Sequence, residues 1–200
     1  MNRKPPFIVF EGLDGSGHST QADLLKNFLE KRGRKILLTK EPTLDSAAGR
    51  KIRKTLEHKI KLNPKELQDL FTKDRAQHLK KTILPALKRG QFVISDRYFF
   101  STFAFGAASG VNLPYLIRQN KKFLHPDITF ILDVKPQTSI FRIEKRGKPK
   151  ELFEKIEKLS KVREVYRSFP KKFKNVYMIN GEKSIGEVFK QIKRRIMDYG

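Results

Sequence analysis

A short apolar run near the start of the chain leads straight into a glycine-rich turn, and this pair constrains the fold more than any other feature. The run is Phe7-Ile8-Val9-Phe10, and the turn reads Gly12-Leu13-Asp14-Gly15-Ser16-Gly17-His18-Ser19-Thr20. A glycine, four residues, a second glycine, a basic residue and a hydroxyl form the spacing of a loop that wraps around phosphate. The glycines let the backbone turn tightly so that its amides point inward, and a helix beginning near Ser19 adds its positive end. We therefore predict a strand, a phosphate-binding loop and a helix, in that order.

One residue departs from this pattern. Lysine is expected where the chain has His18. A lysine is a permanent charge, whereas an imidazole is shorter and only partly protonated near neutral pH. The alternative, a glycine-rich turn that binds nothing, is disfavoured because strand, spacing, hydroxyls and helix coincide.

We predict that Ser19 and Asp96 hold Mg²⁺. The predicted phosphate ligands are Gly12, Gly15, Ser16, Gly17, His18, Ser19 and Thr20.

The rest of the chain alternates short apolar runs with longer amphipathic segments. Such runs suit strands that are buried on both faces of a parallel sheet, and segments with helical periodicity suit the crossover helices. Leu67, Leu70, Phe71 and Ala76 mark one such helix. We predict an α/β fold, a parallel five-stranded sheet flanked by helices in a single domain 1–200, with a small mobile lid at 145–161. The five runs are Phe7–Phe10, Ile36–Leu38, Phe92–Ile94, Thr129–Leu132 and Val176–Ile179.

The formal charge of +23 has three readings: nucleic-acid binding, small phosphate substrates, or a lysine-rich surface of the kind found in heat-adapted proteins. Much of it lies in the amphipathic segment 183–195, where Ile185, Val188, Phe189 and Ile192 are expected to form the buried face. The third reading therefore explains most of the charge, and nucleic acid is not the expected partner. Because no apolar run approaches the roughly 20 residues that cross a bilayer, we expect a cytoplasmic protein without membrane contact.

A second cluster of polar residues follows the third apolar run. Asp96-Arg97-Tyr98 leaves the expected carboxyl end of that strand, with Ser101, Thr102 and Phe105 shortly after it. Arginine can grip a phosphate with a bidentate fork, so Arg97 is a candidate ligand for a second phosphate. A surface salt bridge is the plain alternative for the Asp-Arg pair.

Over nearly its whole length the chain resembles the thymidylate kinases, which are P-loop nucleoside-monophosphate kinases. The most specific match is Leu70-Phe71-Thr72-Lys73-Asp74-Arg75-Ala76-Gln77-His78, which is close to their nucleobase-binding helix. The other matches, in family order, are Phe7–Gly17, Thr39–Pro42, Asp96–Tyr98 with Ser101, Pro126-Asp127, Leu132–Val134 and Val162–Tyr166. The resemblance implies transfer of the γ-phosphate of ATP to dTMP, with Mg²⁺, and a homodimer.

The resemblance also implies roles for single residues. Phe71 stacks on thymine, and Arg75 hydrogen-bonds the edge of the base. Asp14 contacts the deoxyribose or organises the metal shell. Arg97 clamps the acceptor phosphate and Thr102 contacts the base. Arg142 and Arg146 lie in or near the lid, and Arg146 is the expected catalytic cation there.

The chain departs from the family at four places: His18, Lys40 in place of an arginine, Thr43-Leu44-Asp45 in place of Gly-Gly-Thr, and Phe105 in place of a tyrosine near the sugar. Two other enzymes stay open, another pyrimidine nucleoside-monophosphate kinase and a deoxynucleoside kinase, for which Glu41 is a candidate general base. A nucleotide-binding regulator with a decayed loop is the alternative from another class.

Overall fold

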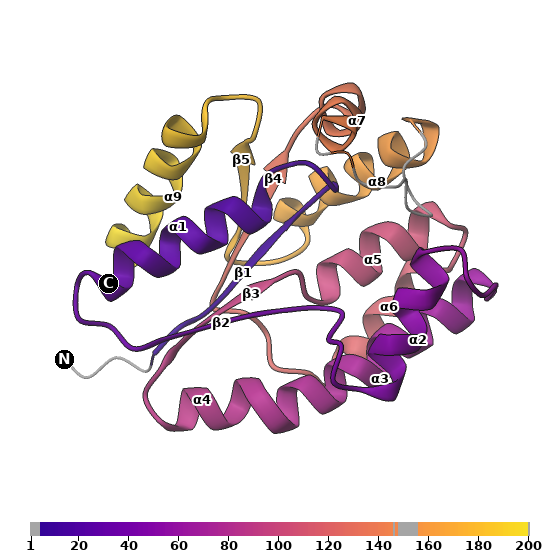
Figure 1. The fold of residues 1–200 in the computed structure, drawn as a ribbon, viewed down its shortest axis with the longest axis horizontal. Helices are drawn as coiled ribbons and strands as arrows, with labels where there is room; N and C mark the ends of the chain where they lie inside the picture. Colours follow the sequence, from indigo (N-terminus) through magenta and orange to yellow (C-terminus); the bar gives the residue numbers. More distant parts are fainter. Residues whose placement is uncertain (1–4, 146, 148–155, 200) are drawn as a thin grey trace.

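The computed structural model describes residues 5–145, 147 and 156–199. Its centre is a sheet of five parallel strands in the order β2-β3-β1-β4-β5 (Figure 1). Each strand contains one of the five predicted apolar runs, so the predicted α/β class and the five-stranded parallel sheet are confirmed. The strands are β1 Phe7–Gly12, β2 Ile36–Lys40, β3 Phe92–Asp96, β4 Ile128–Asp133 and β5 Val176–Asn180.

Helices cover both faces of this sheet. α1 and α9 pack on one face, and the helices between β2 and β4 lie, together with α8, on the other (Figure 1). The helical elements are α1 His18–Glu30, α2 Ala47–Leu56, α3 Pro64–His78, the π-helix Leu79–Ile83, α4 Leu84–Lys88, α5 Phe99–Ala108, α6 Leu113–Asn120, α7 Pro136–Glu144, α8 Ile156–Ser168, the 3₁₀ turn Phe169–Lys171 and α9 Ile185–Tyr199.

Two residues that were predicted to lie on buried apolar helix faces are exposed instead. Ala76 is exposed on α3, because it sits about 140° around the helix from Phe71. Ile185 is 62% exposed at the first turn of α9, whereas Val188 and Ile192 are buried as expected. The first turn of α9 nevertheless contacts α1, because Nε2 of Gln21 donates to the carbonyl of Ile185 at 3.0 Å.

Local capping fixes where α3 begins. The side chain of Asn63 accepts from the backbone N–H of Glu66, and the Glu66 carboxylate accepts from the N–H of Asn63, with Pro64 in the first turn. This reciprocal capping box satisfies two amides that a helix start leaves unpaired. It sets the register with which the rest of α3 reaches the centre of the molecule.

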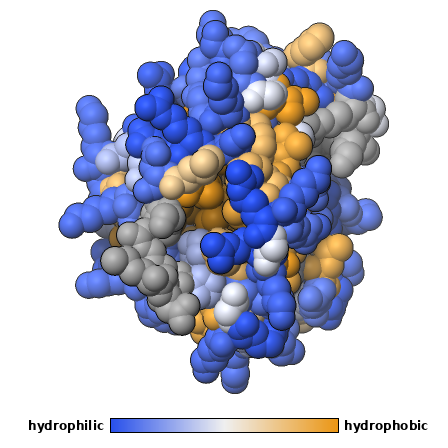
Figure 2. Space-filling model, turned by 90° about the vertical axis from the view of Figure 1, so that its left-hand side faces the viewer, coloured by the Kyte–Doolittle hydropathy of each residue, from blue (hydrophilic) through white to orange (hydrophobic). Residues whose placement is uncertain are grey.

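Most of the predicted lid, including Arg146, lies outside the described residues. Across the parts of the chain that the structure describes, no helix is both long and apolar enough to cross a membrane. Figure 2 shows hydrophilic residues over most of one face, around a smaller hydrophobic area.

Candidate active site

The glycine-rich turn links β1 to α1 and wraps closely against the neighbouring chain. Gly15 has φ +77°, and a Cβ there would lie 2.6 Å from the carbonyl oxygen of Ser139 on α7. Gly12 has φ +149°, and a Cβ there would lie 2.5 Å from Oγ of Ser16. Only glycine fits both positions. Gly17 caps α1 in a left-handed conformation with no side-chain hydrogen bond to the helix start, which leaves those amides for a ligand.

Asp96, the last residue of β3, joins two residues at the start of α1. Oδ1 of Asp96 lies 2.5 Å from Nδ1 of His18, and Oδ2 accepts from the hydroxyl of Ser19 at 2.7 Å. Burial alone would raise the pKa of Asp96, but the charge and hydrogen bond of His18 and the Ser19 hydroxyl hold it well below its usual range. The carboxylate is therefore ionised at the mouth of the phosphate loop.

Arg97, the residue after Asp96, connects the phosphate loop to Ser101 on α5. Its Nη2 donates to Oδ1 of Asp14 at 2.6 Å, and its Nη1 donates to the carbonyl of Gly12 and to Oγ of Ser101, each at 2.9 Å. The backbone has φ +72°, sparsely populated for a residue with a side chain, and its N–H is held by the carbonyl of Phe10 at 2.8 Å. The chain thus fixes both the backbone and the guanidinium of this residue.

The buried carboxylate of Glu11 helps to fix the position of Arg97. Glu11 accepts from the backbone N–H of Tyr98 and from the hydroxyls of Ser101 and Tyr166. Burial raises the pKa of Glu11, although the Arg97 charge and these hydrogen bonds oppose the rise. The network ties the ends of β1 and β3 to α5 and α8, so the position of Arg97 depends on all four elements.

A cleft of about 460 Å³ opens beyond Arg97, and its lining comes from segments far apart in the sequence. It runs from Ser19 and Asp96 at the phosphate loop to Phe71 and Thr102 at the far end, with Arg97 between them. The remaining lining residues are Asp14, Lys40, Glu41, Pro42, Leu44, Arg53, Leu56, Gln68, Arg75, Tyr98, Ser101 and Phe105. One continuous space therefore connects the two predicted sites.

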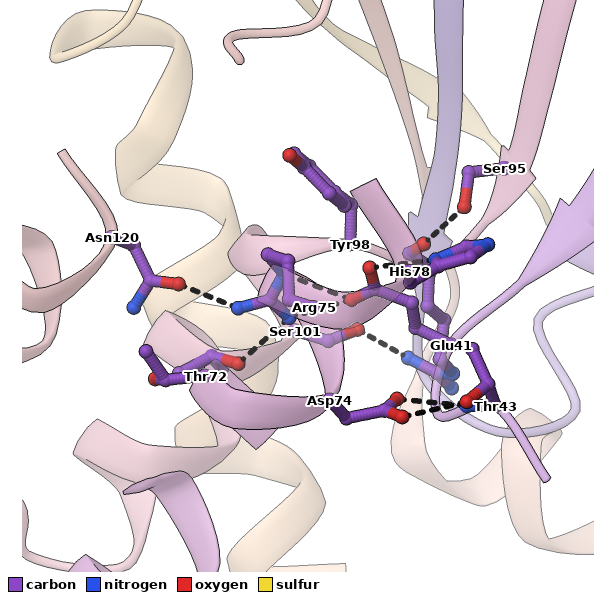
Figure 3. A network of polar contacts seen from close by, with 12 residues as sticks. Glu41, Thr43, Thr72, Asp74, Arg75, His78, Ser95, Tyr98, Ser101 and Asn120 are labelled. Carbon is purple, nitrogen blue, oxygen red and sulfur yellow. Dashed lines mark hydrogen bonds and ion pairs between the residues drawn. The ribbon is translucent and has the colours of Figure 1, made fainter. Parts of the chain in front are cut away.

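Arg75 lies at the far end of this cleft in a buried network of polar contacts (Figure 3). Its Nε donates to Oε2 of Glu41 at 2.9 Å, Nη1 to Oδ1 of Asn120 at 2.6 Å, and Nη2 to Oγ1 of Thr102 at 3.1 Å. The other oxygen of Glu41 lies 3.1 Å from Nδ1 of His78. The segment that follows β2 contributes, as do α3, α5 and α6, so the guanidinium is held rigidly.

Comparison with known proteins identifies the family. A model of the thymidylate kinase family matches residues 10–192. The chain belongs to the thymidylate kinase family. It is 41% identical over 191 residues to a protein of Pyrococcus horikoshii named "Probable thymidylate kinase", and the match covers 93% of each chain. It is 38% identical over 191 residues to the "Thymidylate kinase" of Leptospira borgpetersenii, covering 94% of this chain and 91% of that one.

Within this family member, the structure brings eight of the predicted site residues to one cleft: Asp14, Ser19, Phe71, Arg75, Asp96, Arg97, Thr102 and Phe105. Gly12, Gly15, Ser16, Gly17, His18 and Thr20 form the adjoining turn and helix start instead of the cleft wall. Arg142, predicted in or near the lid, donates to the carbonyls of Gly181 at 3.1 Å and Ser16 at 3.5 Å, on the α7 side of the phosphate loop. Arg146 lies outside the described residues.

Two polar cleft residues were missed by the sequence analysis. Arg53, from α2, and Gln68, from α3, both line the cleft. Gln68 precedes Phe71 by three residues and Arg75 by seven, the spacing of residues on one helix face, so helical periodicity could have found it. No comparable signal marks Arg53, because α2 approaches α3 only in the folded chain.

The residues at the phosphate loop fit a magnesium ion. The hydroxyl of Ser19 and the ionised carboxylate of Asp96 place hard oxygen donors side by side. Mg²⁺ is typically held by one or two carboxylates together with substrate phosphates and water. Among the described residues there is no cluster of three or more histidine, cysteine or acidic side chains that could hold a metal ion.

Proposed function

We propose that this chain is a thymidylate kinase that transfers the γ-phosphate of ATP to dTMP, giving dTDP and ADP. Its family membership implies a nucleotide substrate and ATP as the donor. The observation that carries the proposal is the continuous cleft between the phosphate loop and the Phe71–Thr102 end. A donor bound at one end and an acceptor at the other would meet beside Arg97.

In this proposal, the residues act mainly by positioning and by neutralising charge, as phosphoryl transfer requires. The amides around Gly15 and Gly17 hold the donor phosphates, and Arg97 grips the acceptor phosphate while Asp14 fixes its orientation. Mg²⁺, held by Ser19 and Asp96, supplies positive charge to the donor phosphates. The acceptor is already a phosphate with a second pKa near 6, so it needs no general base.

At the other end of the cleft, the proposal places the thymine ring against Phe71, with Arg75 and Thr102 at its edge. Base stacking on an aromatic ring contributes about 1–3 kcal/mol. Phe105 contacts the sugar region, and the Arg97 guanidinium lies 5.3 Å from its ring centroid. Arg146 stays the predicted catalytic cation of the lid at 145–161. Dimerisation and a cytoplasmic location also stay predictions.

The deoxynucleoside kinase alternative loses its main support. It requires a carboxylate free to accept a proton from a neutral hydroxyl, and Glu41 was the candidate. Glu41 is buried, with one oxygen held by Arg75 and the other by His78. A carboxylate engaged in this way acts as a structural partner.

The test is ADP formation from Mg-ATP with dTMP, dUMP, dCMP, UMP, AMP and GMP, each at several concentrations. We expect the highest kcat/KM with dTMP. A higher value with any purine monophosphate would contradict the proposal. ATP binding without phosphate transfer to any of the six would favour the decayed regulator.

A further inference from the structure

Gln68 is the one cleft residue whose buried polar group is left without a partner in the part of the chain that the structure describes. The residue is 1% exposed, and neither Oε1 nor Nε2 has a hydrogen-bond partner there. A buried amide without partners costs about 1–3 kcal/mol for each unpaired group. A buried amide without partners beside a cleft indicates that a bound ligand supplies the missing hydrogen bonds.

The position of Gln68 in the fold limits what that ligand can be. It shares one face of α3 with Phe71 and Arg75, and all three line the same cleft. Its stem packs against α5, because a Cβ on Gly106 would lie only 3.0 Å from Cγ of Gln68. The missing side chain at Gly106 makes room for the stem, so the amide remains at the cleft beside the proposed base site.

Arg75, the other polar group on this face, is largely occupied. An arginine has five N–H donors, and contacts with Glu41, Asn120 and Thr102 account for four of them. It therefore has little capacity left for a ligand. The carboxamide of Gln68, in contrast, offers two donors and an acceptor, all unpaired.

The pyrimidine-dione edge of thymine has the complementary pattern: the N3–H donor lies beside carbonyl acceptors. An amide can pair with both, accepting from N3–H through Oε1 and donating to a neighbouring carbonyl through Nε2. We propose that Gln68 is a specificity-determining residue that reads the N3 edge of the acceptor base with this pair of hydrogen bonds. The inference rests on the proposed function, since it assumes that the acceptor base occupies this end of the cleft.

The test measures the Kd of dTMP and of 3-deaza-dTMP, whose 4-hydroxy-2-pyridone base carries C–H in place of N3–H and a hydroxyl in place of the 4-carbonyl, without added bulk. The proteins are the wild type, Gln68→Met and Gln77→Met, titrated as full chains. Gln77 is a matched control because it lies nine residues further along α3, half a turn around the helix from Gln68. Wild type and Gln77→Met should prefer dTMP by about tenfold, the value of one hydrogen bond in a buried site.

In Gln68→Met this preference should fall to within about twofold, with ATP affinity unchanged. Gln68→Asn, which withdraws the amide by one carbon, should lose the preference as well and serves if the methionine variant does not fold. Equal affinity of wild type for the two ligands would overturn the inference, as would a preference that survives in Gln68→Met. A purely structural glutamine would change melting temperature but leave the ratio of the two Kd values untouched.

The same titrations separate this inference from the proposed function. Wild-type binding of dTMP without preference over 3-deaza-dTMP overturns the role of Gln68 alone. A clear preference without phosphoryl transfer supports Gln68 while contradicting the kinase proposal. Absence of dTMP binding overturns both.

Discussion

The two ends of the cleft are built in opposite ways. The proposed phosphate loop comes from nine consecutive residues, and its proposed phosphate ligands are backbone amides of a turn that glycine makes possible. The proposed base end is assembled from the segment after β2 and from α3, α5 and α6, and its charged groups are already paired inside the protein. The loop can therefore be recognised in a linear sequence, whereas the base end exists only once the chain has folded. The comparison also predicts that substitutions at the two ends will affect different ligands.

The strongest test concerns Arg97, which lies between the ends. Arg97→Ala should lower kcat/KM for dTMP by about 10³-fold or more, since it removes roughly 4 kcal/mol of charge stabilisation in a buried site. ATP affinity should change by less than about threefold, because the donor amides stay in place. Steady-state kinetics and ATP titration check this, with exposed Arg89→Ala as the control. Collapse of ATP affinity with dTMP affinity intact would show that Arg97 belongs to the donor end.

Arg75 tests whether the base end depends on the fold. Arg75→Ala leaves Glu41 buried without its main partner, so the free energy of unfolding should fall by about 3–5 kcal/mol. dTMP affinity should fall as well, and ATP affinity should hold. Urea unfolding measures the first effect, and exposed Lys26→Ala, which also removes one side of an ion pair, should change it little. A variant as stable as the wild type would contradict the rigid network.

A substitution at His18 tests the phosphate loop, and the expected change in ligand affinity is smaller. His18→Lys replaces the imidazole with a longer side chain that carries a permanent charge, so ATP affinity should rise by about fivefold, equivalent to roughly 1 kcal/mol. dTMP affinity should not change. Exposed His125→Lys adds the same charge elsewhere and controls for its general effect. Unaltered ATP affinity would show that His18 serves only to hold Asp96. Turnover found in His18→Lys but absent from wild type would indicate a decayed kinase.

Phe105 tests sugar selection, where the smallest effect is expected. The ring lines the cleft and lacks the hydroxyl that the family resemblance predicts there. Phe105→Tyr should increase the preference for dUMP over UMP by about threefold, less than 1 kcal/mol. The ratio of the two kcat/KM values is the measurement. Identical ratios in both proteins would mean that the sugar is selected elsewhere.

The sequence predicted the sheet and the phosphate loop because both depend on local patterns. Apolar runs such as Phe7–Phe10 and Thr129–Leu132 suit only a strand buried on both faces, and all five runs became strands. Helical periodicity predicted burial less reliably at the ends and edges of helices. Ile185 is exposed at the first turn of α9, and Ala76 faces solvent because it lies off the apolar face of α3.

The pairing of charged groups could not be predicted, because it joins residues distant in sequence. The sequence analysis placed Asp96 beside Ser19, but it did not predict that His18 would pair with the same carboxylate, 78 positions away. It also did not predict that Arg75 would be held by Glu41 and Asn120. Glu41 shows the consequence most clearly. Its position after β2 suited a general base, and only the fold reveals that Arg75 and His78 occupy it.

The most direct test of the central claim follows the labelled γ-phosphate of ATP. Wild-type protein with Mg-ATP is given either dTMP or thymidine, and the products are separated by chromatography. We predict label in dTDP from dTMP, and none in dTMP from thymidine, because Arg97 is placed to hold an acceptor phosphate and Glu41 is unavailable as a base. Label in dTMP from thymidine, or only in inorganic phosphate, would contradict the account.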